Sequence, residues 1–460
     1  MPQLKKTMFR EYDIRGLESD DELNENSMYY LGKGFGTFLA KRGIKKTIVG
    51  HDIRSSSESF HHQTIKGLLE TGIDVIDIGI ATTPKGYWAQ HFLNIKGLAI
   101  ITASHNPVGW NGAKIGSDLS RTLHSHEIQE VYEIILKENF LKGKGKLTKK
   151  NILEEYIKDL ISKVNIKKKF KILVNTGNGT AAIVAPKILS LVGCEVVEHN
   201  TQIDPTYPNY TPNPEEKAMM KDTSLQTVKN QCFLGFAFDG DGDRVGLVDE
   251  KGNVIWPDRY MILLSRLVLS EKPNSKIIFD VKVSESLPED IKAHGGIPIM
   301  SKTGHSLIKS KIKEEGAALA GEMSGHIYFA QGYYGFDDAI FASLKILEYL
   351  STQDKKLSEI INATPYYIST PTISVKTSDE KKHKIVKKLV EEFKKEGYQV
   401  IDIDGARVYV DDSWGLVRAS NTTPTLVLRF ESKTKKGLDK IQKLFRKKLK
   451  KYIKSSFPHY

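Results

Sequence analysis

Apolar runs and amphipathic segments alternate in the first part of the chain. Residues 47–50 are apolar, residues 58–71 have the spacing of an amphipathic helix that stops at Gly72, and residues 73–78 are apolar again. A strand, a helix and a second strand in this order make a βαβ unit, whose two strands lie parallel. We therefore predict a sheet with a crossover helix in this region.

The same pattern occurs two more times. In each copy an apolar run is followed by an amphipathic helix, a glycine that can end the helix and a second apolar run. The second copy covers residues 172–174, 181–192 and 194–197, and the third covers residues 277–279, 286–294 and 297–300. Three copies of one unit predict three related mixed α/β domains.

The pattern changes after Pro365. Two lysine-rich helical segments, residues 381–395 and 440–454, accompany strand-like runs at residues 368–375, 399–403, 408–410 and 425–430. This combination predicts a smaller C-terminal α+β domain, so that the fold class is α/β with three related domains and a fourth of different type.

Polar, turn-forming segments mark the domain boundaries. They lie at residues 142–150, at residues 249–253 and around Thr364 and Pro365. The predicted domains are 1–148, 149–254, 255–366 and 367–460.

A net charge of +12 and a pI near 9.2 raise the question of nucleic-acid binding. The lysines, however, are concentrated in residues 381–395 and 440–454, where side chains such as Ile385, Leu389 and Phe393 keep helical spacing. They are then the solvated faces of amphipathic helices. We expect no nucleic-acid partner and retain only a general attraction for anionic substrates.

The apolar stretches do not suit a membrane protein. The best candidate, residues 260–269, is broken by Arg266 and is far short of the roughly 20 residues that a helix needs to cross a bilayer. No apolar region follows the lysines of residues 1–10, so we expect no signal peptide. Cys194 and Cys232 lie in apolar runs, which is typical of buried free thiols. These features predict a cytoplasmic protein without a membrane partner.

The first candidate for chemistry is Ser104. It lies in the sequence Thr-Ala-Ser-His-Asn-Pro at residues 102–107, directly after the apolar run of residues 98–101. A strand would deliver this serine to an exposed loop, and Pro107 favours a turn there. Because an ordinary turn has the same signals, the assignment depends on the rest of the chain.

Three carboxylates separated by glycines follow another apolar run. Residues 239–244 have the sequence Asp-Gly-Asp-Gly-Asp-Arg, and glycine spacing lets alternate side chains converge on one hard cation. An EF-hand calcium loop is the nearest rival, but Arg244 stands where that loop needs glycine. We favour a Mg²⁺ site over a calcium loop or a solvated acidic turn.

Two further loops combine glycine with hydrogen-bonding side chains. Residues 302–306 contain His305, and residues 321–326 contain His326, each after a strand-like run. Open α/β sheets bind ligands at such strand ends. Either histidine could be a satisfied loop residue, but their placement makes both candidates for proton transfer.

Residues 418–424, with the sequence Arg-Ala-Ser-Asn-Thr-Thr-Pro, have the chemistry of a phosphate cradle. A guanidinium, hydroxyls, an amide and backbone N–H groups can all donate to phosphate oxygens. The alternative is a polar β-turn before the strand at residues 425–430.

These motifs together resemble those of the α-D-phosphohexomutase family, most closely its bacterial phosphomannomutase/phosphoglucomutase group. The resemblance rests on residues 9–16, 102–107, 239–244, 321–326 and 418–424, in the family's order over nearly the whole chain. It implies four domains around a central active-site cleft. It also implies an isomerase that interconverts the 1- and 6-phosphates of mannose and glucose through a phosphoserine and a hexose 1,6-bisphosphate.

The resemblance also implies residue roles. Ser104 would carry the phosphoryl group, and with it Asp239, Asp241 and Asp243 would hold Mg²⁺. The further catalytic residues would be Arg15, His105, Lys114, Arg244, His305 and His326, with proton transfer left open among His305, His326 and Lys114. The substrate would be bound by Tyr12, Lys282, Glu322, Ser324, Arg418, Ser420, Asn421 and Thr422, of which Glu322 and Ser324 match the residues that grip the sugar hydroxyls at carbons 3 and 4. Glucose 1,6-bisphosphate or mannose 1,6-bisphosphate would be the activator and intermediate.

Alternatives remain at this point. Met323 favours the glucose and mannose group, but phosphoglucosamine mutases share the catalytic motifs. A non-catalytic protein that binds phosphosugars or nucleic acid would explain the charge and the cradle, although not Ser104 together with three aspartates. Residues 409–415 are more acidic than the family leads us to expect. The expected partner is a small hexose phosphate, the expected state is a monomer with a dimer as the alternative, and the fourth domain is expected to rotate near Pro365.

Overall fold

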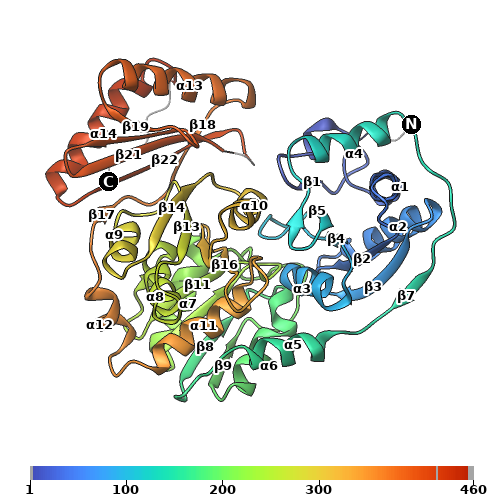
Figure 1. The fold of residues 1–460 in the computed structure, drawn as a ribbon, viewed down its shortest axis with the longest axis horizontal. Coiled ribbons are helices and arrows are strands. Elements are labelled where there is room, and N and C mark those ends of the chain that lie inside the picture. Colours follow the sequence, from blue (N-terminus) through green and yellow to red (C-terminus); the bar gives the residue numbers. More distant parts are fainter. Residues whose placement is uncertain (1–3, 421–422, 454–460) are drawn as a thin grey trace.

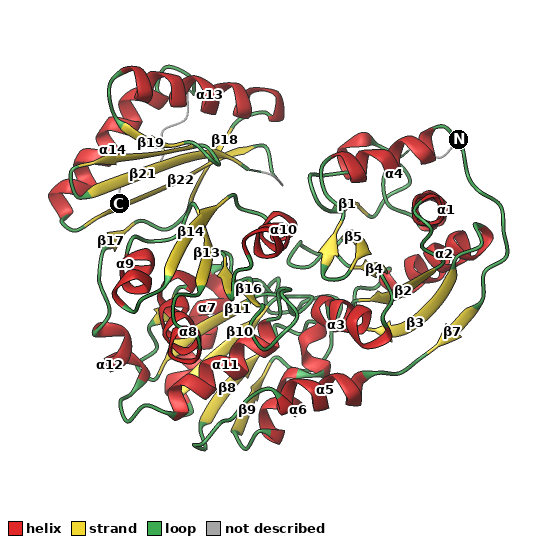
Figure 2. Cartoon of the chain, in the orientation of Figure 1, coloured by secondary structure: helices red, strands yellow, loops and turns green. Residues whose placement is uncertain are grey.

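The computed structural model of the chain describes residues 4–420 and 423–453. Its strands form four sheets that follow one another along the chain. Figure 1 shows an open ring with the first and fourth sheets at its two ends, and Figure 2 shows the helices packed around the sheets. The predicted fold class, three related mixed α/β units followed by a smaller α+β unit, is confirmed.

The first sheet is mixed. Its strands are β1 (Ile14–Leu17), β2 (Lys46–His51), β3 (Asp74–Ile80), β4 (Gly97–Ile101), β5 (Trp110–Asp118), β6 (Arg121–Thr122) and β7 (Leu147–Lys149). Its helices are η1 (Lys6–Met8), α1 (Glu25–Lys41), α2 (Ser57–Glu70), α3 (Thr83–Leu93) and α4 (His126–Leu136). The order is β1-β5-β4-β2-β3-β7 with β6 beside β5, and the predicted βαβ unit is β2, α2 and β3, whose strands are parallel.

The β7 strand lies within a segment that the sequence marks as a domain boundary. Residues 142–150 are a predicted boundary segment, yet Leu147–Lys149 pairs with β3 and extends the first sheet. The polar side chains there are compatible with an edge strand, whose exposed face needs no apolar residues.

The second sheet has the order β12-β11-β10-β8-β9. Its strands are β8 (Lys171–Asn175), β9 (Glu195–His199), β10 (Leu234–Phe238), β11 (Val245–Asp249) and β12 (Val254–Ile255), and its helices are α5 (Leu153–Ser162), η2 (Thr180–Ile183), α6 (Ala185–Leu191) and α7 (Lys217–Lys229). The helix predicted over residues 181–192 is broken into η2 and α6. Pro186 has no amide hydrogen and occupies the first turn of a new helix instead.

The third sheet has the order β14-β13-β15-β16, with β13 parallel to β14 and β15. Its strands are β13 (Lys276–Asp280), β14 (Ile297–Ser301), β15 (Leu319–Gly321) and β16 (Ile327–Phe329), and its helices are α8 (Pro257–Glu271), α9 (Ser286–Ala293), α10 (His305–Glu315), α11 (Ala339–Ser351) and α12 (Leu357–Asn362). The third predicted unit, β13, α9 and β14, is confirmed.

The fourth sheet has the order β17-β22-β21-β20-β19, with β18 beside β22, and its pairs are antiparallel. Its strands are β17 (Ile368–Ser369), β18 (Ile373–Lys376), β19 (Gln399–Ile401), β20 (Ala406–Val410), β21 (Ser413–Ala419) and β22 (Thr425–Ser432), and its helices are α13 (Asp379–Lys395) and α14 (Lys435–Leu449). The strand predicted at residues 368–375 is two strands, because Pro371 lies between them and cannot donate to a ladder.

Sequence reasoning missed β21. Residues 413–419 are buried along their whole length and pair with β20 and β22. The acidic segment at residues 409–415 is the hairpin between β20 and β21. Its turn contains Asp411, which adopts a left-handed φ of 51° that aspartate tolerates better than most residues.

Side-chain caps explain where several helices begin. The Asn24 side chain accepts from the Ser27 amide before α1, and the Thr82 side chain accepts from the Lys85 amide before α3. Asp338 caps α11 in the same way. Each cap satisfies an amide that has no partner within the helix.

One hydrophobic core extends through the first three sheets, and the first unit has a second core around Phe35 and Phe38. The shared core contains Trp88 from α3, Phe236 from β10 and Leu344 from α11. The fourth sheet has a core of its own, with Leu389 and Phe445 at its centre, and a small cluster of Val281, Trp414 and Leu416 joins it to the third. Three units therefore form one packed block, and the fourth contacts the third through this apolar cluster and through the buried side chains of Arg407 and Arg429.

None of the helices within the described residues has the length and apolar character required to span a bilayer. The domain limits given above remain predictions.

Candidate active site

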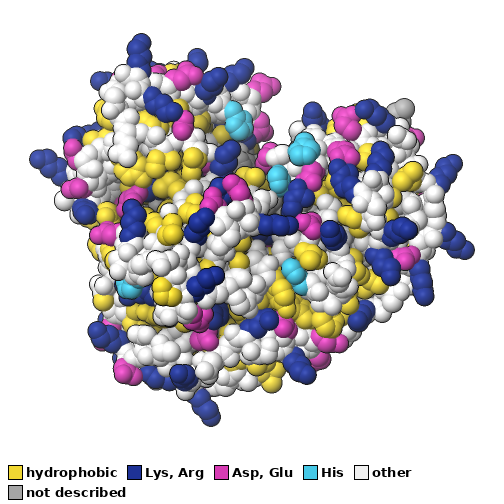
Figure 3. Space-filling model, viewed as in Figure 1, with side chains coloured by type: hydrophobic (Ala, Val, Ile, Leu, Met, Phe, Trp, Pro, Cys, Tyr) yellow, Lys and Arg dark blue, Asp and Glu magenta, His cyan; other side chains and the backbone are white. Residues whose placement is uncertain are grey.

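Loops from all four sheets line one cavity of about 740 Å³. The candidate residues that line it are Tyr12, Arg15, Ser104, His105 and Lys114 from the first unit, Arg244 from the second, Lys282, His305, Glu322, Ser324 and His326 from the third, and Arg418 and Ser420 from the fourth. On the face drawn in Figure 3, a hollow separates the N-terminal and C-terminal lobes. Asn421 and Thr422 lie outside the described residues. The fold thus gathers candidates that are far apart in the sequence.

Ser104 lies in the segment of residues 102–110, which joins β4 to β5 and ends at the first residue of β5; we name it the serine loop. Its Oγ donates to Asp239 Oδ2 at 2.9 Å and lies 3.1 Å from His105 Nδ1. Its amide donates to Thr102 Oγ1 at 2.8 Å. The backbone of Ser104 has a left-handed φ of 50°, which costs a residue other than glycine about 1–2 kcal/mol. The surrounding structure must therefore hold this residue in place.

The hairpin between β10 and β11 forms the aspartate loop, residues 239–244. Asp239, Asp241 and Asp243 are fully buried, and one carboxylate oxygen of each lies within 4.8 Å of the others. Asp239 Oδ1 accepts from the amides of Asp243 and Arg244 at 3.0 and 3.1 Å. Asp241 Oδ1 and Asp243 Oδ1 have no hydrogen-bond partner in the described part of the chain. Clustered carboxylate oxygens with unused acceptor capacity suit a small hard cation such as Mg²⁺.

Lys114 from β5 joins the aspartate loop to the first sheet. Its Nζ donates to Asp241 Oδ2 at 2.8 Å and to Asp243 Oδ2 at 2.5 Å. Burial opposes ionisation of Asp241, but Lys114 holds the pKa of Asp241 well below its usual range. Burial and the carboxylates of Asp243 and Asp241 raise the pKa of Asp239 well above its usual range. One lysine thus leaves negative charge in the cluster that a divalent cation would balance.

Arg15 from β1 links the serine loop to Asp13. Its guanidinium lies 3.0 Å from Asp13 Oδ2 and donates to Asn106 Oδ1 at 3.4 Å. The positively charged guanidinium of Arg15 therefore lies beside the serine loop and lines the cavity.

Two histidines of the cavity, His105 and His305, have lowered pKa values. Burial, with Arg244 and Arg15 nearby, lowers the pKa of His105 well below its usual value. Burial also lowers the pKa of His305, although its Nε2 lies 3.2 Å from Asp13 Oδ1. Tyr12 packs edge-on against the His305 ring, with the ring centres 4.8 Å apart.

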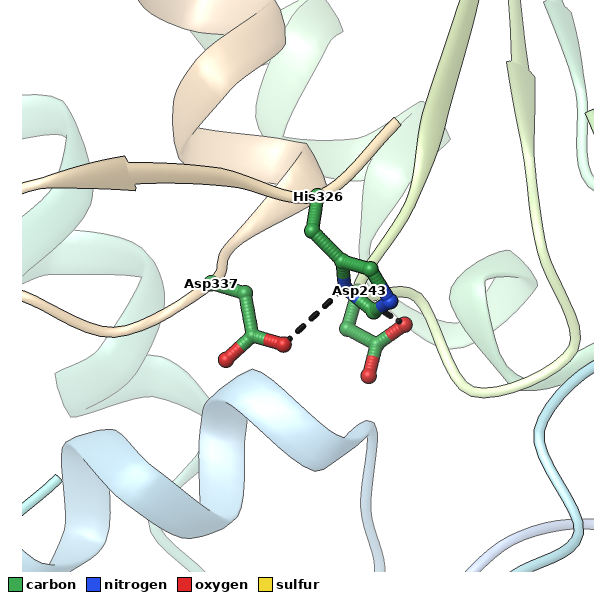
Figure 4. A group of neighbouring side chains, drawn as sticks. All are labelled: Asp243, His326 and Asp337. Carbon is green, nitrogen blue, oxygen red and sulfur yellow. Dashed lines mark ion pairs between the residues drawn. The ribbon is translucent and has the colours of Figure 1, made fainter. Parts of the chain in front are cut away.

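His326 is held between two carboxylates and an arginine (Figure 4). Its Nδ1 lies 3.0 Å from Asp337 Oδ2 and 3.5 Å from Asp243 Oδ1. Its Nε2 accepts from the Nε of Arg244 at 3.0 Å. Because a guanidinium only donates, the proton of this imidazole is assigned to Nδ1, on the carboxylate side. Nε2 becomes available to another donor when Arg244 moves away.

The third unit also supplies fixed polar groups for a sugar. Glu322 Oε1 accepts from the Gly304 amide at 2.7 Å, and Oε2 accepts from the Tyr328 hydroxyl at 2.7 Å. Ser324 lies on the same turn, and Lys282 lies 3.4 Å from Asp280 Oδ2. The Glu322 carboxylate is therefore fixed in orientation before any ligand binds.

Arg418 lies at the far end of the cavity, on β21. Its Nε donates to Asp404 Oδ2 at 2.9 Å, and the same oxygen accepts from the Thr303 amide at 3.0 Å. The buried NH2 nitrogen of Arg418 has no hydrogen-bond partner among the described residues. Ser420 Oγ accepts from the Thr423 amide at 3.1 Å. An unpaired guanidinium nitrogen beside a hydroxyl-rich turn is ready to bind an anion.

Several residues of the site were missed by sequence reasoning. Asp13 could have been found, because it stands two residues before Arg15 in a segment already singled out. Three others belong to no motif: Asp337, Asp404 and Glu215. The Glu215 carboxylate lies 3.0 Å from the guanidinium of Arg244, which is 29 residues away in the sequence.

Models of four successive domains of one protein family match the chain. They are described as phosphoglucomutase/phosphomannomutase alpha/beta/alpha domain I at residues 6–142, domain II at 154–252, domain III at 256–367 and the C-terminal domain at 373–448. The chain belongs to the phosphoglucomutase/phosphomannomutase family. The resemblance stated from the motifs is thereby confirmed.

Individual members of the phosphoglucomutase/phosphomannomutase family are similar over their full length. The phosphomannomutase/phosphoglucomutase of Pseudomonas syringae pv. tomato is 41% identical over 450 residues, which are 98% of this chain and 96% of that protein. The phosphoglucomutase of Neisseria gonorrhoeae is 38% identical over 454 residues, 97% of each chain. The crystal structure of a family protein from Burkholderia thailandensis has a TM-score of 0.93 at 35% identity, covering 99% of this chain and 100% of that one. The chain is therefore an enzyme of the phosphohexomutase class, an isomerase.

Proposed function

We propose that this enzyme interconverts the 1-phosphates and 6-phosphates of glucose and mannose through phosphorylated Ser104 and a hexose 1,6-bisphosphate. The observation that carries the proposal is the position of Ser104. Its Oγ lies 2.9 Å from Asp239 in the aspartate loop, at the wall of a cavity that all four units line.

The reaction consists of two phosphoryl transfers in opposite directions. In the first, the bond between Ser104 Oγ and phosphorus breaks, and a hydroxyl oxygen of the hexose phosphate forms a new bond to phosphorus. The proton of that hydroxyl passes to a base, and Ser104 Oγ takes up a proton. In the second transfer the other phosphate of the bisphosphate returns to Ser104. The isomeric hexose phosphate is left, and nothing is hydrolysed or oxidised.

Charged side chains near Ser104 suit this transfer. Burial opposes protonation of Lys114, but the carboxylates of Asp241 and Asp243 raise its pKa, so that it stays an ammonium. Arg15 and Arg244 also line the cavity and can bind phosphoryl oxygens.

The proton acceptor can be argued from the imidazole geometry. We propose His326, because its Nε2 is an acceptor engaged only by Arg244 among the contacts described above. A phosphate that draws Arg244 toward itself would release this nitrogen for the sugar hydroxyl. His305 then positions Tyr12 and Asp13 on the opposite wall.

The aspartate loop fits Mg²⁺. Two buried carboxylate oxygens have no hydrogen-bond partner among the described residues, and the pKa of Asp239 is raised; both features suit a cation. When bound there by Asp239, Asp241 and Asp243, Mg²⁺ would neutralise charge on the transferring phosphoryl group.

The far end of the cavity would hold the phosphate that is not being transferred. Arg418 offers the nitrogen that has no partner within residues 4–420 and 423–453, and Ser420 also lines the cavity. Asn421 and Thr422 are proposed to join them on the strength of the motif alone. Glu322 and Ser324 would bind the hydroxyls at carbons 3 and 4, and since glucose and mannose differ at carbon 2, both sugars fit. Lys282 and Tyr12 line the cavity and would also contact the substrate.

The bisphosphate has to turn end for end between the two transfers. The fourth unit has a separate core and a small apolar contact with the third, and we propose that it rotates near Pro365 to allow this turn. Scattering profiles recorded with and without substrate should differ. Superimposable profiles would remove the support for this motion.

The test of the proposed function is an assay of the purified protein on the 1-phosphates of mannose, glucose and glucosamine. It contains Mg²⁺ and a trace of glucose 1,6-bisphosphate as activator, and Ser104→Ala is assayed in parallel. We expect turnover of the first two sugars that is lost in the variant. Turnover confined to glucosamine phosphate would identify a phosphoglucosamine mutase instead, and turnover without Ser104 would contradict the mechanism.

Two further proposals concern the cellular location and the oligomeric state. We propose a cytoplasmic enzyme that acts as a monomer, and light scattering on the purified protein would distinguish the monomer from a dimer.

A further inference from the structure

Arg54 is buried beneath the serine loop and belongs to none of the motifs described above. It follows β2 and precedes α2, and its side chain is only 3% exposed. It is not among the residues that line the cavity. A buried arginine outside the substrate site requires a structural partner, and it has an unusual set of them.

The guanidinium of Arg54 donates to four backbone carbonyl oxygens of the serine loop. Its NH2 nitrogen donates to Ser104 O at 2.9 Å and to Asn106 O at 2.5 Å. Its NH1 nitrogen donates to Pro107 O at 3.0 Å and to Trp110 O at 3.1 Å. The loop therefore curls around one planar, five-donor group, which no other side chain can replace.

Neighbours hold the Arg54 side chain itself in place. Asp52 Oδ2 lies 3.4 Å from its Nε, and Asp52 Oδ1 accepts from the Arg54 amide at 3.0 Å and from Ser57 Oγ at 2.5 Å. On the other side, the ring of Tyr207 from the second unit lies 5.2 Å from the guanidinium carbon. Arg54 is thus oriented by both units whose loops form the transfer site.

The carbonyl of Ser104 is enclosed from two sides. Arg54 donates to it, and Gly240 of the aspartate loop lies so close that a Cβ at this position would collide with the Ser104 oxygen. This packing occurs at the residue with the left-handed φ of 50°. If the bonds from Arg54 were lost, the buried carbonyl of Ser104 would lose this donor and the strained conformation would lose an important support.

We propose that Arg54 is the positioning residue that holds the serine loop in the conformation needed for phosphoryl transfer. The inference rests on the proposed function, because it concerns the loop of phosphorylated Ser104. Arg54 acts through the backbone and touches no reacting atom. Its loss should slow transfer at Ser104 and leave the binding of hexose phosphate at the Arg418 end of the cavity almost unchanged.

The experiment measures how fast Ser104 is phosphorylated. Dephosphorylated full-length enzyme is mixed with Mg²⁺ and glucose 1,6-bisphosphate carrying labelled phosphate, and the label on Ser104 is followed in a single turnover, per folded molecule. We expect Arg54→Met to react about 100-fold more slowly, since a misplacement of about 1 Å at a reacting group has this effect. Arg54→Lys, which supplies one point charge instead of a fork, should react at an intermediate rate.

A matched control is Arg42→Met. Arg42 is an arginine of the same unit whose guanidinium binds Glu130 away from the serine loop, and this variant should react at the wild-type rate. Melting temperatures and the KM for hexose phosphate are recorded for every variant. A purely structural role of Arg54 would lower the folded fraction and leave the rate per folded molecule unchanged.

The outcomes separate the two claims. A wild-type rate per folded molecule in Arg54→Met overturns the inference, and if that variant does not fold, a wild-type rate in Arg54→Lys overturns it equally. A slower rate with an unchanged KM supports it. If neither wild type nor Arg42→Met takes up label on Ser104, the proposed function itself is contradicted, and the role of Arg54 falls with it.

Discussion

The two ends of the cavity are built differently. At the transfer end, the side chains of Ser104 and the aspartate loop are almost fully buried, and Lys114 and Asp239 each make two or more hydrogen bonds. The opposite end contains Arg418 and Ser420, and we name it the grip end. There, Arg418 keeps a buried nitrogen without a partner among the described residues. Among the described residues, the unpaired groups of the transfer end are the acceptors Asp241 Oδ1 and Asp243 Oδ1, which suit a cation, whereas the unpaired group of Arg418 is a donor, which suits an anion.

The two ends of the cavity also lie on different hydrophobic cores. The transfer end lies on the block formed by the first three units, which share a core, and the grip end lies on the fourth unit with a core of its own. The proposed rotation of the fourth unit would therefore leave the core packing around Ser104 in place.

The largest effect is expected from Ser104→Ala. Removal of the group that accepts the phosphate should lower kcat by about 10⁴-fold or more, while calorimetry should still detect hexose phosphate, because the grip end is intact. Ser420→Ala at the other end is the matched control and should raise KM more than it lowers kcat. Equal loss of binding and turnover in Ser104→Ala would mean that the two ends do not act separately.

A smaller effect is expected from Asp241→Asn. It removes one charge from the aspartate loop and one partner of Lys114, and it should lower kcat by about 10²- to 10³-fold. A titration of activity against Mg²⁺, after removal of the metal with a chelator, should need more metal in the variant. An unchanged Mg²⁺ requirement would contradict the assignment of this loop.

Arg418→Ala tests the grip end. A charge-assisted hydrogen bond contributes about 1.5–3 kcal/mol, so KM should rise about 10- to 100-fold with a smaller change in kcat. Asp404→Asn, which weakens the orientation of Arg418 through its Nε contact at 2.9 Å, should have the same sign and a smaller size. A fall in kcat at constant KM would place Arg418 in the chemistry instead.

The smallest effect concerns two neighbouring carboxylates behind His326. Asp337 is paired with Lys309 at 3.2 Å and with His326. Asp338 accepts hydrogen bonds from Tyr156 and Tyr333 instead, and burial raises its pKa from 3.8 to about 6. The folded protein therefore holds a proton on Asp338 that the unfolded chain releases between these values.

The raised pKa of Asp338 in the folded protein determines how the stability changes with pH. The contribution of protonated Asp338 to stability is fully present below about pH 4 and is lost as the pH rises through about 6. Asp338→Asn removes the titration, so its melting temperature relative to wild type should be a few degrees higher at pH 7.5 than at pH 4. A difference that does not vary with pH would show that Asp338 is ionised throughout.

Much of the fold could be predicted because its signals are local. Each βαβ unit carries its own apolar runs, amphipathic helix and terminating glycine. β21 was missed because its sequence, Ser-Trp-Gly-Leu-Val-Arg-Ala, is buried on both faces and follows two aspartates, so neither alternation nor a flanking pattern marks it as a strand. The break at Pro186 was overlooked because the apolar spacing continues across it.

Some residues of the site could likewise be predicted from local sequence signals, and others could not. Ser104, the three aspartates and Arg418 could be proposed because each lies in a short segment whose residue types already suggest a chemistry. Arg54, Asp337 and Asp404 could not be, since their partners are backbone carbonyls or side chains far away in the sequence. Single-sequence reasoning finds groups that touch a ligand more readily than groups that hold those residues in place.

The most direct test of the central claim follows the phosphate itself. Enzyme labelled on Ser104 is separated from free label, mixed with Mg²⁺ and unlabelled mannose 1-phosphate, and quenched within one turnover. We expect the label to leave Ser104 and to appear first in mannose 1,6-bisphosphate and then in mannose 6-phosphate. Label that stays on the protein, or leaves it only as inorganic phosphate, would contradict the account.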